Sequence, residues 1–123
     1  MASLLEKIKA LSNSIAEETV TNRHHLHMHP ELSFQETATQ AYVEKQLNAW
    51  GIPNSRLANT GVVGIIKGKN PGKKVVALRA DMDALPITET NDVPYKSTNP
   101  GVMHACGHDV HTSSLLGTAH ILQ

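Results

Sequence analysis

The chain has one cysteine, no excess of charge of either sign and no long hydrophobic run, and each absence excludes a class of protein. Cys106 has no partner for a disulfide within the chain, so a reducing compartment, the cytoplasm, is expected. Acidic and basic residues number 11 each, and this zero formal charge argues against a surface that binds nucleic-acid phosphates. Charges interrupt residues 1–18 every few positions, so neither a signal peptide nor a membrane span is predicted there.

The length and composition are those of one globular domain, and its partner is expected to be a small molecule. A compact fold of 123 residues buries about two-thirds of the surface that its unfolded chain exposes, so a sizeable core can form. The sequence has no internal repeat, low-complexity tract or linker. Residues 1–123 are therefore expected to form a single domain.

Two helices are predicted in the first half of the chain. Apolar residues recur at helical spacing over residues 3–28, which predicts one amphipathic helix that ends before Pro30. Ser33 and Glu36 have the spacing of a capping box, in which each side chain bonds the backbone amide of the other residue. A second helix is expected to begin there and to end at Gly51.

Several histidines lie at the end of the first predicted helix. His25 and His29 are four residues apart and could chelate a metal from one helix face. A histidine near a helix C-terminus is also favoured by the helix dipole, and this structural role is preferred. The residues concerned are His24, His25, His27 and His29.

The second half of the chain predicts strands and a last helix. The runs Val62–Ile66 and Val75–Leu78 are continuously apolar, which is typical of a sheet covered by helices on both faces, and hence of an α/β sandwich. Asp109 is a good N-cap for the last helix. Its sequence stops at Gln123 without a capping signal, which predicts truncation in mid-helix. The expected buried stripe consists of Leu115, Leu116, Ala119 and Leu122.

Two acidic residues directly follow the second predicted strand. Ligands in covered α/β sheets sit beyond the carboxyl ends of strands, where Asp81 and Asp83 lie. Side chains alternate along a strand, so the two carboxylates would share a face if the strand continued to them. The alternative is an ordinary acidic loop that Arg79 neutralises.

The densest chemistry lies in the stretch His104–His111. Cys106 and His108 are separated by one glycine, and a thiolate with a neutral imidazole suits zinc-like divalent ions. Gly107 permits the left-handed backbone that would turn both side chains inward. These two residues are predicted to form half of a metal site. The alternative is a buried cysteine with histidines that cap a helix.

Three motifs in order resemble a known family. They are Arg23–Glu36, Leu78–Ile87 and His104–Asp109. Together they are similar to the metal-dependent amidohydrolases related to aminoacylase and carboxypeptidase G. The most similar branch contains hippurate hydrolase, N-acetyldiaminopimelate deacetylase and the plant indole-acetyl amino acid hydrolases.

The resemblance implies a three-layer α/β/α zinc-peptidase-like catalytic domain, of which residues 1–123 are the N-terminal portion. It also implies two divalent metal ions, manganese or zinc, with Cys106 and His108 as the first two ligands. Asp83 matches an acid that orients a ligand without binding metal itself. Asp81 stands where other branches have a metal-binding histidine, and its direct role is open.

The same resemblance implies hydrolysis of N-acyl amino acids. The family places its general base, its further metal ligands and its dimerising lid domain downstream. This chain alone is therefore expected not to turn over substrate. An interrupted sheet would also expose an edge, which predicts a homo-oligomer.

Two other functions stay open on the sequence. In a thiol hydrolase, Cys106 would be the nucleophile and His104, His108 or His111 its base. Such a pair is awkward, because its members are nearly adjacent in sequence. In a metal-binding or regulatory domain, the fold and the two ligands would remain without catalysis.

Overall fold

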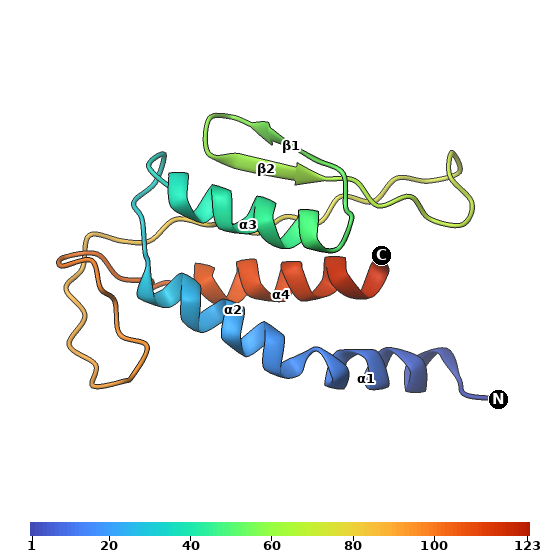
Figure 1. Cartoon of the computed structure of the whole chain (residues 1–123), viewed down its shortest axis with the longest axis horizontal. Coiled ribbons are helices and arrows are strands. Elements are labelled where there is room, and N and C mark those ends of the chain that lie inside the picture. The colour runs from blue at the N-terminus through green and yellow to red at the C-terminus, as the bar shows by residue number, and fades with distance from the viewer.

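The computed structural model describes residues 1–123 and shows an incomplete α/β domain (Figure 1). Helix α4 lies between α2 and α3, and a two-stranded antiparallel hairpin borders α3 on the other side. The pairing sets Asn54 opposite Gly64 and Leu57 opposite Gly61. The elements are α1 Leu4–Ser14, α2 Ala16–Met28, α3 Thr37–Ala49, β1 Asn54–Leu57, β2 Gly61–Gly64 and α4 His108–Leu122.

The core sits where α3, α4 and the hairpin meet. Its four buried members come from these elements and the turn after α3: Val43, Leu47, Ile52 and Leu116. Half-buried side chains, among them Trp50 and Met82, pack around this cluster. The core is small, and much of the apolar sequence stays exposed outside it.

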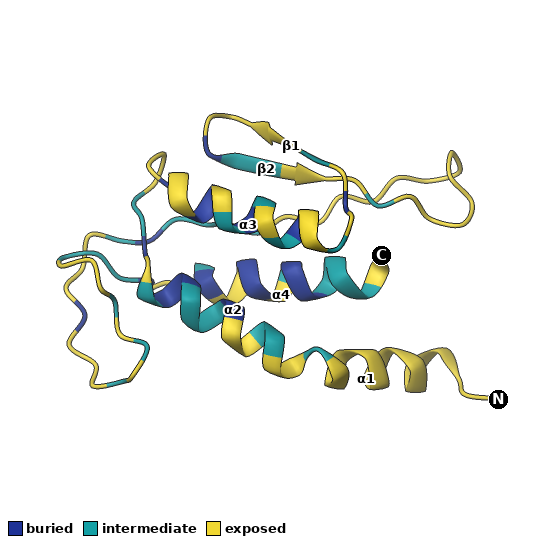
Figure 2. Cartoon of the chain, in the orientation of Figure 1, coloured by how far each residue is buried: buried dark blue, intermediate teal, exposed yellow.

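The single helix predicted over residues 3–28 is wrong: the structure has two helices with a break at Ile15. Ile15 has φ −105° and ψ 4°, so the helical path is interrupted there. Beyond the break α2 follows the surface of α4, whereas α1 runs away from it and buries no residue (Figure 2). Because of the break, α2 packs its buried residues against α4, while the apolar residues of α1 stay exposed.

The capping box predicted for Ser33 and Glu36 is also absent. The buried carboxylate of Glu36 instead accepts a hydrogen bond from Thr60 Oγ1 at 2.6 Å. The amides that open α3 donate to Glu31, from Ala38 at 3.0 Å and from Thr39 at 2.6 Å. Because Glu31 supplies the acceptor, the helix begins at Thr37, after Glu36.

The strand predictions are correct only in part. The run Val62–Ile66 contributes to β2, and its partner β1 consists of the mostly polar residues Asn54–Leu57, where no strand was predicted. Val75–Leu78 forms no strand, because no other segment of the protein pairs with it. Val75 is 95% exposed and Val76 79% exposed, so in this chain neither apolar run has helices on both faces.

The last helix is present, but its cap and its buried face differ from the prediction. Gly107 is the N-cap, in the left-handed conformation at φ 84°, and Asp109 lies buried in the first turn. Leu116 alone of the predicted stripe is fully buried, and Leu122 is exposed. The other buried residues of α4 are small or polar, and Gly117 among them allows close approach to Thr19 of α2. None of the helices is both long and apolar enough to cross a membrane.

Candidate metal centre

Three potential metal ligands converge where the extended segment before Ala84 meets the start of α4. The side-chain ligand atoms of Asp81, His108 and His111 all lie within 4.8 Å of one another. His108 and His111 are three apart in α4, so they share a face of its first turn, with ring centroids 5.5 Å apart. The sequence suggested His111 only as a possible base for the Cys106 thiol. Its spacing from His108 is the signal that could have identified it as a ligand.

The imidazole of His108 contacts Asp83 through one of its ring nitrogens. His108 Nδ1 lies 2.9 Å from the backbone oxygen of Asp83 and 3.0 Å from its Oδ1. A carbonyl oxygen can only accept, so Nδ1 carries the proton and Nε2 keeps its lone pair free for a metal ion. A ligating histidine is commonly oriented in this way by an outer carboxylate or carbonyl.

Asp81 is fixed by contacts on both sides. Its Oδ1 accepts from Arg79 Nη2 at 2.6 Å, while its Oδ2 lies 3.9 Å from His108 Nε2. Thr112 Oγ1 donates to the Asp81 backbone oxygen at 2.9 Å, which ties this segment to α4. Arg79 therefore does neutralise one side of the acid, and the other side faces the free nitrogen of His108.

Cys106 is exposed in the turn that precedes α4. Gly107 has the left-handed backbone predicted for it, which turns the chain directly into the helix. Cys106 is not one of the three residues whose ligand atoms cluster. Its role as a ligand stays a prediction, as does the orienting role of Asp83.

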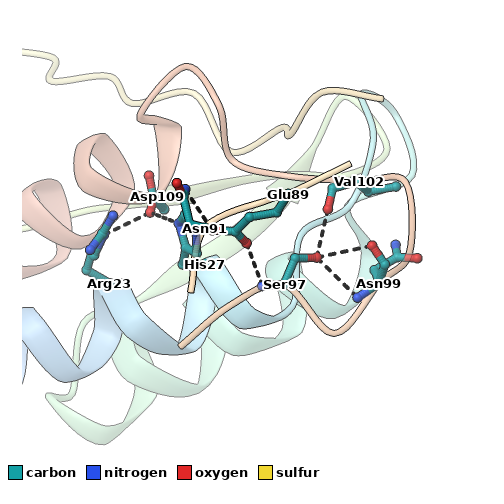
Figure 3. A network of polar contacts seen from close by, with 8 residues as sticks. All are labelled: Arg23, His27, Glu89, Asn91, Ser97, Asn99, Val102 and Asp109. Carbon is teal, nitrogen blue, oxygen red and sulfur yellow. Dashed lines mark hydrogen bonds and ion pairs between the residues drawn. The ribbon is translucent and has the colours of Figure 1, made fainter. Parts of the chain in front are cut away.

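A buried polar network lies directly beside this cluster (Figure 3). His27 bridges two carboxylates, with Nδ1 2.8 Å from Asp109 Oδ2 and Nε2 3.0 Å from Glu89 Oε1. Arg23 Nε donates to the same oxygen of Asp109 at 2.9 Å. The sequence gave His27 only a dipole role and did not single out Glu89, but both are buried. No local sequence signal marks them, because their partners are far away in the chain.

The carboxylates of this network are stabilised in their charged form. Burial would raise the pKa of Glu89, but hydrogen bonds from the Ser97 amide and from His27 bring it down to about 2. Burial opposes ionisation of Asp109 too, yet the His27 hydrogen bond and the charges of His104 and Arg23 lower its pKa. Both groups are therefore anions at neutral pH.

The sequence suggested His104 only as a possible base for the Cys106 thiol. Its ring is buried, and neither ring nitrogen has a hydrogen-bond partner. Burial is the main cause that lowers the pKa of His104, and it outweighs the opposing charge of Asp109. Oδ1 of Asp109 is also buried without a partner, so unsatisfied polar atoms gather beside the start of α4.

The donor set at the start of α4 fits a divalent metal ion. One carboxylate and two imidazoles are ligands that zinc and manganese both accept, and His108 already presents a free nitrogen. Asp81 would hold the ion together with His108 and His111, and Asp83 would orient His108.

Comparisons with known proteins relate the part of the chain that carries this site to one family of hydrolases. Residues 77–123, which contain all three clustered residues, match the model of peptidase family M20/M25/M40. The N-acyl-L-amino acid amidohydrolase of Geobacillus stearothermophilus is 52% identical over 117 residues, covering 94% of this chain and 31% of that protein. Thermostable carboxypeptidase 2 of Saccharolobus solfataricus is 48% identical over 121 residues, covering 97% of this chain and 30% of that protein.

The fold has a solved counterpart as well. The crystal structure of a Bacillus subtilis protein, described as a dinuclear metal binding peptidase from the M20 family, superimposes with a TM-score of 0.84 at 44% sequence identity. The match covers 89% of this chain and 31% of that one. The chain thus spans about a third of the length of the relatives it matches.

Proposed function

We propose that the chain is the N-terminal part of a protein of peptidase family M20/M25/M40 and that this protein hydrolyses N-acyl amino acids at a dinuclear metal centre. One observation carries the proposal. Asp81, His108 and His111 bring their ligand atoms within 4.8 Å of one another, and Asp83 leaves His108 Nε2 free. A relative named as an N-acyl-L-amino acid amidohydrolase supports the substrate class.

The residues of this chain would hold and orient the metal. We assign Cys106 and His108 as ligands, with Asp81 and His111 close enough to contribute, and Asp83 as the group that fixes His108. Bound divalent cations, manganese or zinc, would polarise the amide carbonyl and lower the pKa of a bound water. The sequence offers both the thiolate that favours zinc and the carboxylate that favours manganese.

Residues 1–123 would then form the N-terminal portion of a catalytic domain. Its lid and dimerisation domain and the general base would lie outside these residues. This chain alone is proposed not to turn over substrate, since a metal site without a base and a complete pocket cannot complete the reaction. We also place the protein in the cytoplasm, because an exposed, unpaired thiol such as Cys106 suits a reducing compartment.

Metal binding is the first test. After exhaustive chelation, the chain is expected to bind manganese or zinc in calorimetry and elemental analysis. The variants His108→Ala and Cys106→Ala should each lose at least tenfold in affinity, since each removes a ligand. His29→Ala, at the exposed histidine that directly follows α2, is the matched control and should bind like the wild type.

The same variants separate the competing functions. Equal metal binding by wild type and His108→Ala would contradict the metal centre. In the longer protein, activity that survives chelation but is lost on alkylation of Cys106 would instead support a thiol hydrolase. Metal binding without any hydrolysis of N-acyl amino acids would support a binding domain.

A further inference from the structure

The imidazole of His27 is enclosed by carboxylates on both sides (Figure 3). Nδ1 lies 2.8 Å from Asp109 Oδ2 and Nε2 lies 3.0 Å from Glu89 Oε1. The side chain of His27 is 4% exposed and each carboxylate 1% exposed, so water cannot replace either contact. The two acids come from α4 and from the loop before it, while His27 comes from α2.

This geometry fixes the number of protons on the ring. A neutral imidazole has one N–H group, and its other nitrogen would face an oxygen lone pair at hydrogen-bond distance. Asp109 is kept ionised by its further contact with Arg23, and Glu89 accepts from the Ser97 amide at 2.7 Å. Glu89 Oε1, the oxygen that faces His27, also accepts from Asn91 Nδ2 at 3.2 Å, so donors reach both oxygens of Glu89. Donors of this kind stabilise each acid as a carboxylate, and both ring nitrogens are then placed to donate.

The charges of the network balance only with that protonation. Asp109 and Glu89 contribute two negative charges, and Arg23 contributes one positive charge. A neutral His27 would leave one buried carboxylate without a cation, which is costly in a dry interior. The only other ionisable rings beside it are Tyr95, edge-on at 5.6 Å, and the unpartnered His104, at 6.4 Å.

We propose that His27, as an imidazolium held between Asp109 and Glu89, is a positioning residue that fixes the first turn of α4. That turn carries His108 and His111, so the clamp sets where these two side chains stand relative to Asp81. The effect on metal binding rests on the proposed function. The charge of His27 and its effect on the first turn of α4 can be tested without metal.

Proton count is the direct test. In the ¹⁵N-labelled full chain at neutral pH, His27 is expected to show two ring N–H groups protected from solvent, unlike the exposed His29. Glu89→Gln keeps the shape of the side chain and still accepts from Ser97, but its amide group can donate to Nε2. His27 should then keep a single ring proton, on the side of Asp109. One ring proton in the wild type would overturn the charge assignment.

Positioning is read from His108. In the metal-free chain, Glu89→Gln should shift or broaden the ring signals of His108, whereas the control His29→Gln should leave them unchanged. Manganese or zinc affinity of Glu89→Gln should fall on the order of tenfold relative to that control, as for other groups that orient ligands. Unchanged His108 signals would overturn the positioning role. A wild type that binds no metal would overturn the proposed function, while the His108 signals would still decide the role of the clamp.

Discussion

Glu31 takes the capping role that the spacing predicts for Ser33 and Glu36. Glu36 is buried against Thr60, whereas Glu31, six residues before the helix start at Thr37, accepts from the amides of Ala38 and Thr39. A carboxylate at a helix N-terminus satisfies free amides and interacts favourably with the dipole. Which acid reaches the amides is decided by the path of the loop.

Glu31→Ala should therefore destabilise the fold. Loss of an N-terminal cap costs about 1 kcal/mol, and the free energy of unfolding in urea should fall by that amount. Glu31→Gln keeps one acceptor oxygen and should lose less. Gln35→Ala, at an exposed position of the same loop, is the control and should stay close to the wild type. Equal stability of Glu31→Ala and the control would show that water replaces the cap.

Glu89 should make stability depend on pH in the acid range. Its pKa is lowered in the folded chain from 4.5 to about 2, against the effect of burial, by hydrogen bonds from Ser97, His27 and Asn91. A folded-state pKa below the unfolded one stabilises the fold fully above about 4.5, and this contribution is lost as the pH falls toward about 2.

Glu89→Gln cannot titrate, so its free energy of unfolding should fall less steeply than that of the wild type across this pH interval. Urea unfolding at a series of pH values measures both slopes. Glu17→Gln, on the exposed side of α2, is the matched control and should keep the steeper slope. Parallel slopes for Glu89→Gln and the wild type would rule out this contribution of Glu89.

At the scale of elements, α4 joins the core to the metal centre. Its first turn presents His108 and His111. Leu116, further along the same helix, belongs to the core. Its close approach to the preceding helices depends on Gly117, where an added Cβ would lie 3.0 Å from both Ile15 Cδ1 and Thr19 Oγ1. The break at Ile15 and the glycine in α4 thus face each other.

Gly117→Val should separate these helices. Overpacking at a tight contact costs typically 1–3 kcal/mol, so the unfolding free energy should drop by about 2 kcal/mol. Ser114→Val introduces the same β-branched side chain at an exposed position of α4 and controls for helix propensity. If both variants unfold at the same urea concentration, the tight contact at Gly117 does not contribute to the loss of stability.

At the scale of the whole molecule, the exposed apolar surface stands out. The segment Val75–Leu78 pairs with no strand, and Val75 at 95% and Val76 at 79% are among the most exposed large hydrophobic residues of the chain. Unpaired extended segments of this kind favour association with another chain. The remaining length of an M20-type protein, about two-thirds, would be the natural cover.

In the isolated chain, this surface should cause self-association. Sedimentation velocity is expected to show oligomers that increase with concentration, and Val76→Lys should shift the distribution toward monomer. Asn70→Lys adds the same charge at an exposed position of the preceding loop without removing apolar surface. A monomer at all concentrations, or equal effects of both variants, would contradict association through Val75–Leu78.

The sequence by itself determined the local chemistry of this protein. The spacing of Cys106, Gly107 and His108 predicted a turn with a left-handed glycine, which the structure has, and the three motifs resemble the family that the comparisons also match. The helical segments were predicted near their observed places, although residues 3–28 form two helices, because apolar periodicity and turn residues are encoded within a few positions of one another.

Tertiary structure alone decided which distant groups meet. His27 pairs with Asp109 and Glu89 across 82 and 62 positions of sequence, and Glu31 displaced the predicted cap because the loop brings it to α3. A strand also needs a partner, so Val75–Leu78 stays unpaired in this chain despite its apolar sequence. These outcomes depend on contacts between segments far apart, which no local pattern can specify.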